Sequence, residues 1–140
     1  MAHLEHEIMS EAFEKWHIRG IGDNNKALHV FTQPDNGYAH NHPFDFTTHI
    51  LEGSYIEEVW HISKDTGKYF SVEIERKAGT MHKVHANTIH LITEIPQGKC
   101  ITLCTYGEWK QQPGFYKFEN GKAYYKQWNE TDDKFKLIEV

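Results

Sequence analysis

The feature that most constrains the fold of this chain is a series of short segments with β-strand patterns, separated by turn sequences. The clearest pair flanks Asn120-Gly121, a dipeptide typical of a two-residue type I′ hairpin. Pro96-Gln97-Gly98 joins another pair, with turn chemistry at both Pro and Gly. The expected strands cover residues 26–32, 54–62, 68–76, 88–95, 99–106, 115–118 and 123–126. Short strands at this regular spacing predict an all-β sandwich or jelly roll.

The N-terminal segment has a different pattern, with apolar side chains at intervals of four. These side chains are Leu4, Ile8, Ala12 and Trp16. The interval places all of them on one side of a helix. We therefore expect one N-terminal α-helix over residues 4–16, packed on the outside of the sheet and ended by a turn cluster at residues 20–25.

Length and charge limit the functional classes. The 140 residues are most simply one domain, residues 1–140, with enough length for a single core. The formal net charge is −5 and there is no run of Lys or Arg, which argues against a nucleic-acid or anionic-membrane partner. No apolar stretch approaches the ~20 residues needed to span a bilayer, and the charged N-terminus lacks the apolar region of a signal peptide.

The two cysteines, Cys100 and Cys104, lie four residues apart in an expected strand. Their Cα atoms would be about 13 Å apart in an extended strand, beyond the ~7 Å limit for a disulfide. We expect free, buried thiols, as in a reducing compartment, and therefore a cytoplasmic protein.

Two histidine-rich segments carry the chemistry. His40 and His42 lie two residues apart, so on an extended strand both imidazoles point to the same face and reach one ion. The segment at residues 79–90 supplies a third histidine, for which we favour His90. The hypothesis is a β-barrel whose interior holds a divalent metal on these three rings.

These segments resemble the two motifs of the cupin superfamily, which are small double-stranded β-helix (jelly-roll) barrels. The first motif reads G-x5-H-x-H-x3,4-E-x6-G; His40, His42 and Gly53 fall in register, whereas Pro34 stands at its leading glycine and Phe46 at its glutamate. The second motif reads G-x5-P-x-G-x2-H-x3-N. Gly79 and His90 match it, whereas its proline, second glycine and asparagine are replaced by His85, Asn87 and Glu94.

The resemblance covers roughly residues 28–128 and extends to a group of small bacterial and phage cupins with a His-x-His-Pro-aromatic-Asp-Phe segment. It implies a cupin-type barrel over about residues 26–128, a homodimer and a small-molecule substrate. Without the motif's glutamate, the site resembles that of the three-histidine cupins, such as the thiol dioxygenases, and this favours Fe(II). Zinc, nickel, copper and manganese remain alternatives, because imidazole accepts most of these ions.

A fourth ligand is left open. In the simple strand phase Phe44, Phe46, Thr48 and Ile50 point inward, whereas Asp45 and His49 point outward. We favour this phase. Asp45 or His49 reaches the ion only if Pro43 introduces a bulge, and His85 is an equally open candidate for the pocket lining.

Several other residues are candidates for the pocket. Arg76 continues the apolar face of its strand, where it either binds an acidic group of the substrate or extends to solvent. Glu58 shares a face with Trp60 and is either an inward general base or a surface charge. Phe46 and Trp60 are candidate substrate-binding aromatics, and Glu58, His85 and Tyr106 are candidate proton-transfer groups. His3, His6, His17, His29 and His61 are interpreted as structural histidines.

Three functional hypotheses follow. The first is a metal-dependent enzyme on a small organic molecule, most plausibly an Fe(II) dioxygenase. The second is a sugar-nucleotide isomerase or epimerase in which a histidine acts as a base, backed by a carboxylate. The third is a non-catalytic metal- or ligand-binding protein. Cupins host all of these activities, so the fold by itself does not select among them.

Overall fold

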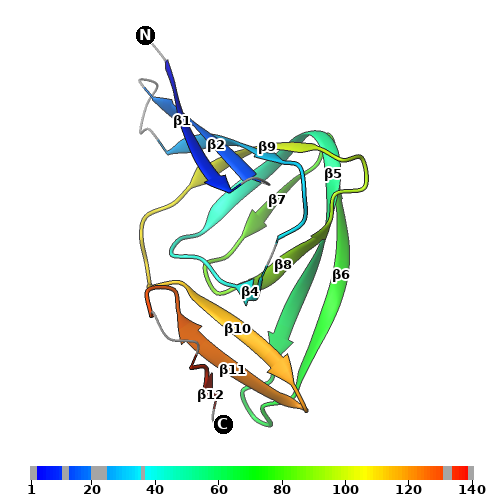
Figure 1. Cartoon of the computed structure of the whole chain (residues 1–140), viewed down its shortest axis with the longest axis vertical. Helices are drawn as coiled ribbons and strands as arrows, with labels where there is room; N and C mark the ends of the chain where they lie inside the picture. The colour runs from blue at the N-terminus through cyan, green and yellow to red at the C-terminus, as the bar shows by residue number, and fades with distance from the viewer. Residues whose placement is uncertain (1–2, 11–12, 20–24, 36, 131–133, 139–140) are drawn as a thin grey trace.

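The structure is a computed structural model that describes residues 3–10, 13–19, 25–35, 37–130 and 134–138 (Figure 1). All regular elements in these residues are β-strands. The described residues contain no helix that is long and apolar enough to cross a membrane. The strands are β1 (His3–Ser10), β2 (Phe13–Arg19), β3 (Lys26–Phe31), β4 (Ala39–His40), β5 (Phe46–Ile62), β6 (Tyr69–Lys77), β7 (Met81–Val84), β8 (Ile89–Glu94), β9 (Cys100–Tyr106), β10 (Gly114–Glu119), β11 (Lys122–Gln127) and β12 (Lys136–Leu137).

The strands form two antiparallel sheets joined through β5. The N-terminal sheet contains β1, β2, β3, β9, the first half of β5 and β7, with β9 and β7 paired to β5 on its two sides. The C-terminal sheet contains β6, the second half of β5, β8, β4, β10, β11 and β12. Figure 1 shows the two sheets facing one another around an interior, with β5 running along one side of both.

A glycine marks the point where β5 passes from one sheet to the other. The register between β5 and β9 shifts between Ile50 and Glu52, and Gly53 follows with a φ of 74°. A Cβ atom at this position would collide with the carbonyl oxygen of Lys99, directly before β9. Only glycine therefore allows the strand to turn while it keeps its pairing.

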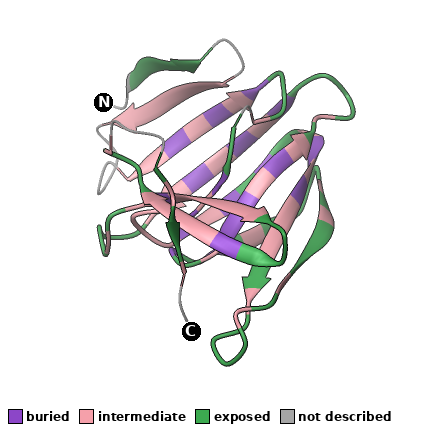
Figure 2. Cartoon of the chain, turned by 60° about the horizontal axis from the view of Figure 1, so that its bottom comes forward, coloured by how far each residue is buried: buried purple, intermediate pink, exposed green. Residues whose placement is uncertain are grey.

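The core lies between the sheets and follows the alternation of the strands. Along β3, Ala27, His29 and Phe31 are buried and the residues between them are only partly buried (Figure 2). The simple phase expected for the first half of β5 is confirmed, because Phe46, Thr48 and Ile50 are buried whereas His49 is exposed. Two buried clusters fill the interior: Phe31, Ile50, Tyr55, Ile92 and Cys100, and Phe46, Val84 and Cys104.

The prediction of an N-terminal helix is wrong. Residues 3–10 and 13–19 are the antiparallel strands β1 and β2, and β2 pairs with β3 at the edge of the N-terminal sheet. The apolar interval of four fits a strand equally well, because every second or fourth residue of a strand lies on one face. Leu4, Ile8 and Trp16 accordingly share one face of the hairpin, as the register of β1 and β2 shows. Ala12 lies outside the described residues.

The two predicted turns between strand pairs have different outcomes. Asn120 and Gly121 both have positive φ, 53° and 74°, and β10 and β11 pair around them as the type I′ pattern predicted. The turn at Pro96-Gln97-Gly98 is not a hairpin. It carries the chain from β8 in the C-terminal sheet to β9 in the N-terminal sheet, and each of these strands pairs with β5.

Candidate metal centre

Strand pairing brings two of the three candidate ligands together. His40 in β4 lies directly opposite His90 in β8, so their Cβ atoms are close neighbours on one face. His42 follows β4 and reaches the same interior, because its backbone N–H donates to the Ala86 carbonyl oxygen at 3.1 Å. The intervening Asn41 fixes the segment to β10, since its side-chain oxygen accepts a hydrogen bond of 2.7 Å from the N–H of Gly114.

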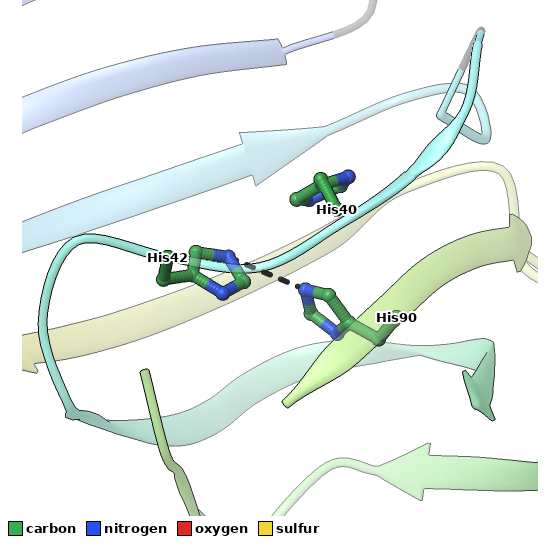
Figure 3. A group of neighbouring side chains, drawn as sticks. All are labelled: His40, His42 and His90. Atoms are coloured by element: carbon green, nitrogen blue, oxygen red, sulfur yellow. Dashed lines mark hydrogen bonds between the residues drawn. The ribbon is translucent and has the colours of Figure 1, made fainter. Parts of the chain in front are cut away.

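The three imidazoles converge (Figure 3). The ring centroids lie 5.2 Å apart for His40 and His42, 5.0 Å for His40 and His90, and 4.8 Å for His42 and His90. One nitrogen from each ring lies within 4.8 Å of the corresponding nitrogen of the other two. The structure thus brings together the three histidines predicted from the sequence, from β4, the loop after it, and β8.

The spacing of the His42 and His90 nitrogens fits a divalent ion. A metal–nitrogen distance of about 2.1 Å places neighbouring ligand nitrogens about 3.0 to 3.4 Å apart for octahedral or tetrahedral angles. The Nε2 atoms of His42 and His90 are 3.3 Å apart. In His40 and His90 the other nitrogen, Nδ1, is 3.3 Å from the Tyr38 carbonyl oxygen and 3.4 Å from the Glu57 carboxylate respectively, which leaves Nε2 for an ion.

The electrostatics of the site favour neutral imidazoles. Burial, and then the neighbouring His90 and His40, lower the pKa of His42 to about 2. Burial and the nearby His90 also lower the pKa of His40. A neutral imidazole has an unprotonated nitrogen whose lone pair is available to a metal ion at neutral pH.

Glu57 contacts His90 on the side of the ring away from the ion site. The sequence analysis did not identify Glu57 as a functional residue. Its carboxylate is buried, with Oε2 3.4 Å from Nδ1 of His90 and Oε1 3.2 Å from Nη2 of Arg76. Burial raises the pKa of this carboxyl group, but His90 and Arg76 outweigh burial and hold it below its usual value. The carboxylate therefore accepts the Nδ1 proton of His90 and fixes its tautomer, as in the carboxylate–histidine–metal arrangement.

Glu58 lies on the face of β5 opposite Glu57 and is not among the residues that line the cavity, so its position does not support the general-base alternative. β5 has one extra residue against β9 between Ile50 and Glu52, so the inward face passes from Ile50 to Tyr55 and Glu57. Arg76 shares the inward side, but its guanidinium pairs with Glu57 and does not line the cavity.

A cavity of about 300 Å³ lies beside the three histidines, inside the barrel. Phe46 and Tyr106, two of the predicted pocket residues, line it. The Phe46 ring, at the position of the motif's glutamate, lies 4.8 Å from the His42 ring and forms an apolar wall there. An open groove of about 790 Å³ shares Phe13, Phe31, Asp35 and His40 with this cavity, so the groove leads to the metal site.

Other predicted residues lie outside this cavity. The Trp60 ring stacks on Phe118 of β10 with centroids 4.1 Å apart, so it packs between strands. His85 is exposed in the loop before β8, and His49 is exposed on the outer face of β5. Asp45 accepts hydrogen bonds from Lys110 and from the Ala86 N–H, which lower its pKa to about 2. None of the three open candidates for a fourth ligand joins the histidine group.

The interior also contains two polar residues for which the sequence gave no functional signal. His29, interpreted as structural, is buried and lines the cavity, where it contacts the Tyr106 hydroxyl. Lys15, within the segment expected to be a helix, lines the cavity from β2. The position of Lys15 depends on the hairpin that replaces the expected helix, and His29 is its cross-strand partner in β3.

Comparisons with known proteins agree on the fold. No protein-family model and no curated protein matches the sequence. Among solved structures, the cupin domain of CENP-C from Drosophila melanogaster matches with a TM-score of 0.56 at 10% identity, over 74% of this chain and 75% of that chain. Hydroxypropylphosphonic acid epoxidase from S. wedmorenis matches with a TM-score of 0.55 at 14% identity, over 74% of this chain and 55% of the epoxidase.

A third similar structure is the oxalate decarboxylase of Bacillus subtilis, with a TM-score of 0.56 at 15% identity, over 78% of this chain and 29% of that chain. Related structures are described with Fe(II) for the epoxidase, with Mn(II) centres for the decarboxylase and, for CENP-C, as bound to CAL1. This chain spans about half of the epoxidase and less than a third of the decarboxylase. The likeness in fold, together with the motif histidines gathered in the interior, identifies this chain as a protein with the cupin fold.

Proposed function

We propose that this chain is a metal-dependent enzyme that acts on a small organic molecule, and most specifically an Fe(II) dioxygenase. The observation that carries this proposal is the convergence of three imidazoles beside a cavity, with one ligand atom of each within 4.8 Å of the others. A divalent ion held by three imidazoles retains open coordination positions that serve both an organic substrate and dioxygen.

The residues of the chain have separate tasks in this proposal. Glu57 orients His90, so that its Nε2 is presented to the ion. Phe46 closes one side of the site with an apolar ring, which excludes water and leaves no carboxylate as a fourth ligand. Tyr106 keeps its proton at neutral pH, because burial raises the pKa of its hydroxyl, and it is the proton-transfer candidate that lies in the cavity.

The choice of metal rests on similar folds and on ligand chemistry. Structures with this fold include an Fe(II) epoxidase and a decarboxylase with Mn(II) centres. A set of three neutral nitrogen ligands also accepts zinc, nickel and copper. Fe(II) is our first choice because a site without a carboxylate ligand resembles that of the three-histidine dioxygenases.

A second candidate function is an isomerase or epimerase in which a histidine acts as a base without a metal. The contact of 3.4 Å between His90 Nδ1 and Glu57 favours this alternative, because a carboxylate on one imidazole nitrogen raises the basicity of the other. Retention of a metal ion through purification separates the two, since this alternative needs none.

The test removes one ligand and measures metal content. We expect His90→Ala to lower bound transition metal from about one equivalent to less than about a tenth, because two imidazoles hold a divalent ion far more weakly than three. The measurement is elemental analysis of protein reconstituted with Fe(II) under anaerobic conditions and desalted. His85→Ala is the matched control, since that histidine is exposed and outside the group, and it should retain full metal content.

Two outcomes contradict the proposal. Wild-type protein that holds less than about a tenth of an equivalent of any transition metal after reconstitution has no open-site metal chemistry, and a His90→Ala variant with unchanged metal content rules out the ligand assignment. With metal content established, substrate-dependent oxygen uptake distinguishes the dioxygenase from a non-catalytic metal-binding protein.

A further inference from the structure

The cavity has a second polar end, opposite the three histidines. The histidines belong to β8, β4 and the loop after β4, whereas the other end is formed by Lys15 of β2, His29 of β3 and Tyr106 of β9. Lys15 and His29 are direct cross-strand partners, so their side chains share the inner face of the N-terminal sheet. Most of the wall between the two ends is apolar.

Lys15 places a cation at this end of the cavity, whereas the carboxylate that lines the cavity, that of Asp35, acts on His40 at the histidine end. Its Nζ lies 5.6 Å from the Phe13 ring centroid and 6.0 Å from that of Tyr106, and both rings line the cavity. In the part of the chain that the structure describes, no carboxylate lies within 4 Å of Nζ. Glu7, its partner across β1 and β2, is exposed and contacts His17 at 3.4 Å.

The energetics of this cation favour an anionic ligand. Burial lowers the pKa of Lys15, and the charge of Glu7 only partly offsets this effect. A desolvated ammonium group without a partner is costly, and an anion beside it removes much of that cost. Lys15 and the three histidines line the same cavity of about 300 Å³, so one small molecule can reach both ends.

The Tyr106 hydroxyl lies at the same end as Lys15, beside a buried polar cluster. Burial raises the pKa of the Cys104 thiol, so it keeps its proton, and its Sγ lies 3.5 Å from Nδ1 of His29. Nε2 of His29 contacts the Tyr106 hydroxyl. In the His29 tautomer with the hydrogen on Nε2, the Tyr106 oxygen accepts that hydrogen and its own hydroxyl hydrogen is available to a ligand oxygen.

The charge at this end matches one negative charge. Burial lowers the pKa of His29 to about 3, so the ring is neutral and Lys15 carries the only positive charge among the three residues. We propose that Lys15 and Tyr106 form the subsite for the carboxylate of a small monoanionic substrate, whose other end reaches the metal. This inference rests on the proposed function and names its substrate class. A cavity of about 300 Å³ is at the lower limit for ligand pockets, which suits a short-chain acid.

The test compares propionate with propionamide, which have nearly the same shape and differ in charge. Each is titrated by ¹H–¹⁵N NMR into zinc-loaded and into metal-free protein. We expect propionate to bind at least tenfold more tightly than propionamide in wild type, with shifts at Lys15, His29 and Tyr106. Lys15→Met should weaken propionate at least tenfold and leave propionamide within about twofold.

Lys83→Met is the matched control, because it removes the same charge from an exposed residue of β7. It should leave propionate binding unchanged. Circular dichroism and thermal unfolding establish that each variant is folded. If Lys15→Met is poorly folded, Lys15→Arg provides the test instead. Because it retains the charge, it should keep most of the preference for propionate over propionamide.

Failure of this inference differs from failure of the proposed function. Equal binding of propionate and propionamide, or unchanged propionate binding in Lys15→Met, overturns the carboxylate subsite even when the protein takes up a full equivalent of metal. If the protein takes up no metal but metal-free protein still prefers propionate through Lys15, the proposed function is overturned and the anion subsite stands.

Discussion

At the level of single residues, the orientation of His90 depends on the carboxylate of Glu57. That carboxylate contacts His90 Nδ1 at 3.4 Å and the Arg76 guanidinium at 3.2 Å, and it is almost fully buried. The guanidinium neutralises a charge that would otherwise be costly in the interior, so the charge remains available to the histidine.

We therefore expect Glu57→Gln to weaken metal binding by about 10- to 100-fold. The amide lacks the negative charge that fixes the His90 tautomer, and its NH₂ group faces a second donor in Arg76 or His90. Competition with a chromophoric chelator measures the change. Glu58→Gln removes the same charge from the opposite face of β5 and should alter the affinity by less than about twofold. Equal affinities for the two variants would contradict the role of Glu57.

The residues that sequence reasoning located are those whose positions follow from spacing alone. His40, His42 and His90 occupy motif positions, and the inward phase of Phe46 follows from simple alternation before the first irregularity of β5. Glu57 was missed because the extra residue of β5 between Ile50 and Glu52 reverses the alternation before Glu57, whereas the apolar residues Ile56 and Trp60 favour the opposite face as the inward one.

At the level of elements, β5 is the strand that both sheets share. Its register shifts twice, between Ile50 and Glu52 against β9 and between Ile56 and Glu57 against β8. Gly53 lies between these shifts, at the change of sheet. This glycine therefore sets the direction of the half of β5 that carries Glu57.

We expect Gly53→Ala to lower the free energy of unfolding by about 2 to 5 kcal/mol, because left-handed backbone and close packing each add a cost. The new Cβ would meet the carbonyl oxygen of Lys99 and the Cα of Cys100, the residue of β9 that pairs with Gly53. Gly121→Ala is the control. It has the same φ of 74° but open space around it, so only the backbone cost of about 1 to 2 kcal/mol applies. Urea unfolding measures both, and equal losses would show that the contact with β9 is unimportant.

The N-terminal hairpin shows where periodicity is ambiguous. Leu4, Ile8 and Trp16 have even numbers and intervals that are multiples of four, so a helix and a strand both place them on one face. The deciding fact is tertiary: β2 pairs with β3 along six residues of each strand. The local pattern of residues 4–16 does not contain this pairing. The position of Lys15 in the cavity could therefore not be predicted from the sequence.

At the level of the whole molecule, the outer face of the N-terminal sheet carries exposed apolar side chains on several strands, among polar ones such as Glu14 and Lys26. Trp16, Leu28 and Leu103 are successive cross-strand partners on this face. Four apolar side chains around them are 48% to 68% exposed: Leu4, Ile8, Leu51 and Met81. An apolar surface of this extent is typical of an interface, so we propose that two copies of this chain pair through it as a homodimer.

Ile8→Glu should weaken that homodimer at least tenfold, because it places a charge in the apolar face at a residue already 68% exposed in the single chain. Analytical ultracentrifugation over a range of concentrations gives the dissociation constant. Phe70→Glu is the control, since Phe70 is also highly exposed but belongs to β6 of the C-terminal sheet. A wild-type protein that sediments as a monomer at all concentrations contradicts the proposal.

The two polar ends of the cavity lie on different parts of the backbone, and this arrangement affects how such a protein can diversify. The imidazole cluster is held by β4, β8 and the loop between β4 and β5, whereas Lys15 and His29 project from β2 and β3. Substitutions in β2 and β3 can change which molecule binds in the cavity without a change to the residues that would bind the ion. Recognition and reactivity can then vary independently, and a mutagenesis library aimed at new substrates has its natural targets in β2 and β3.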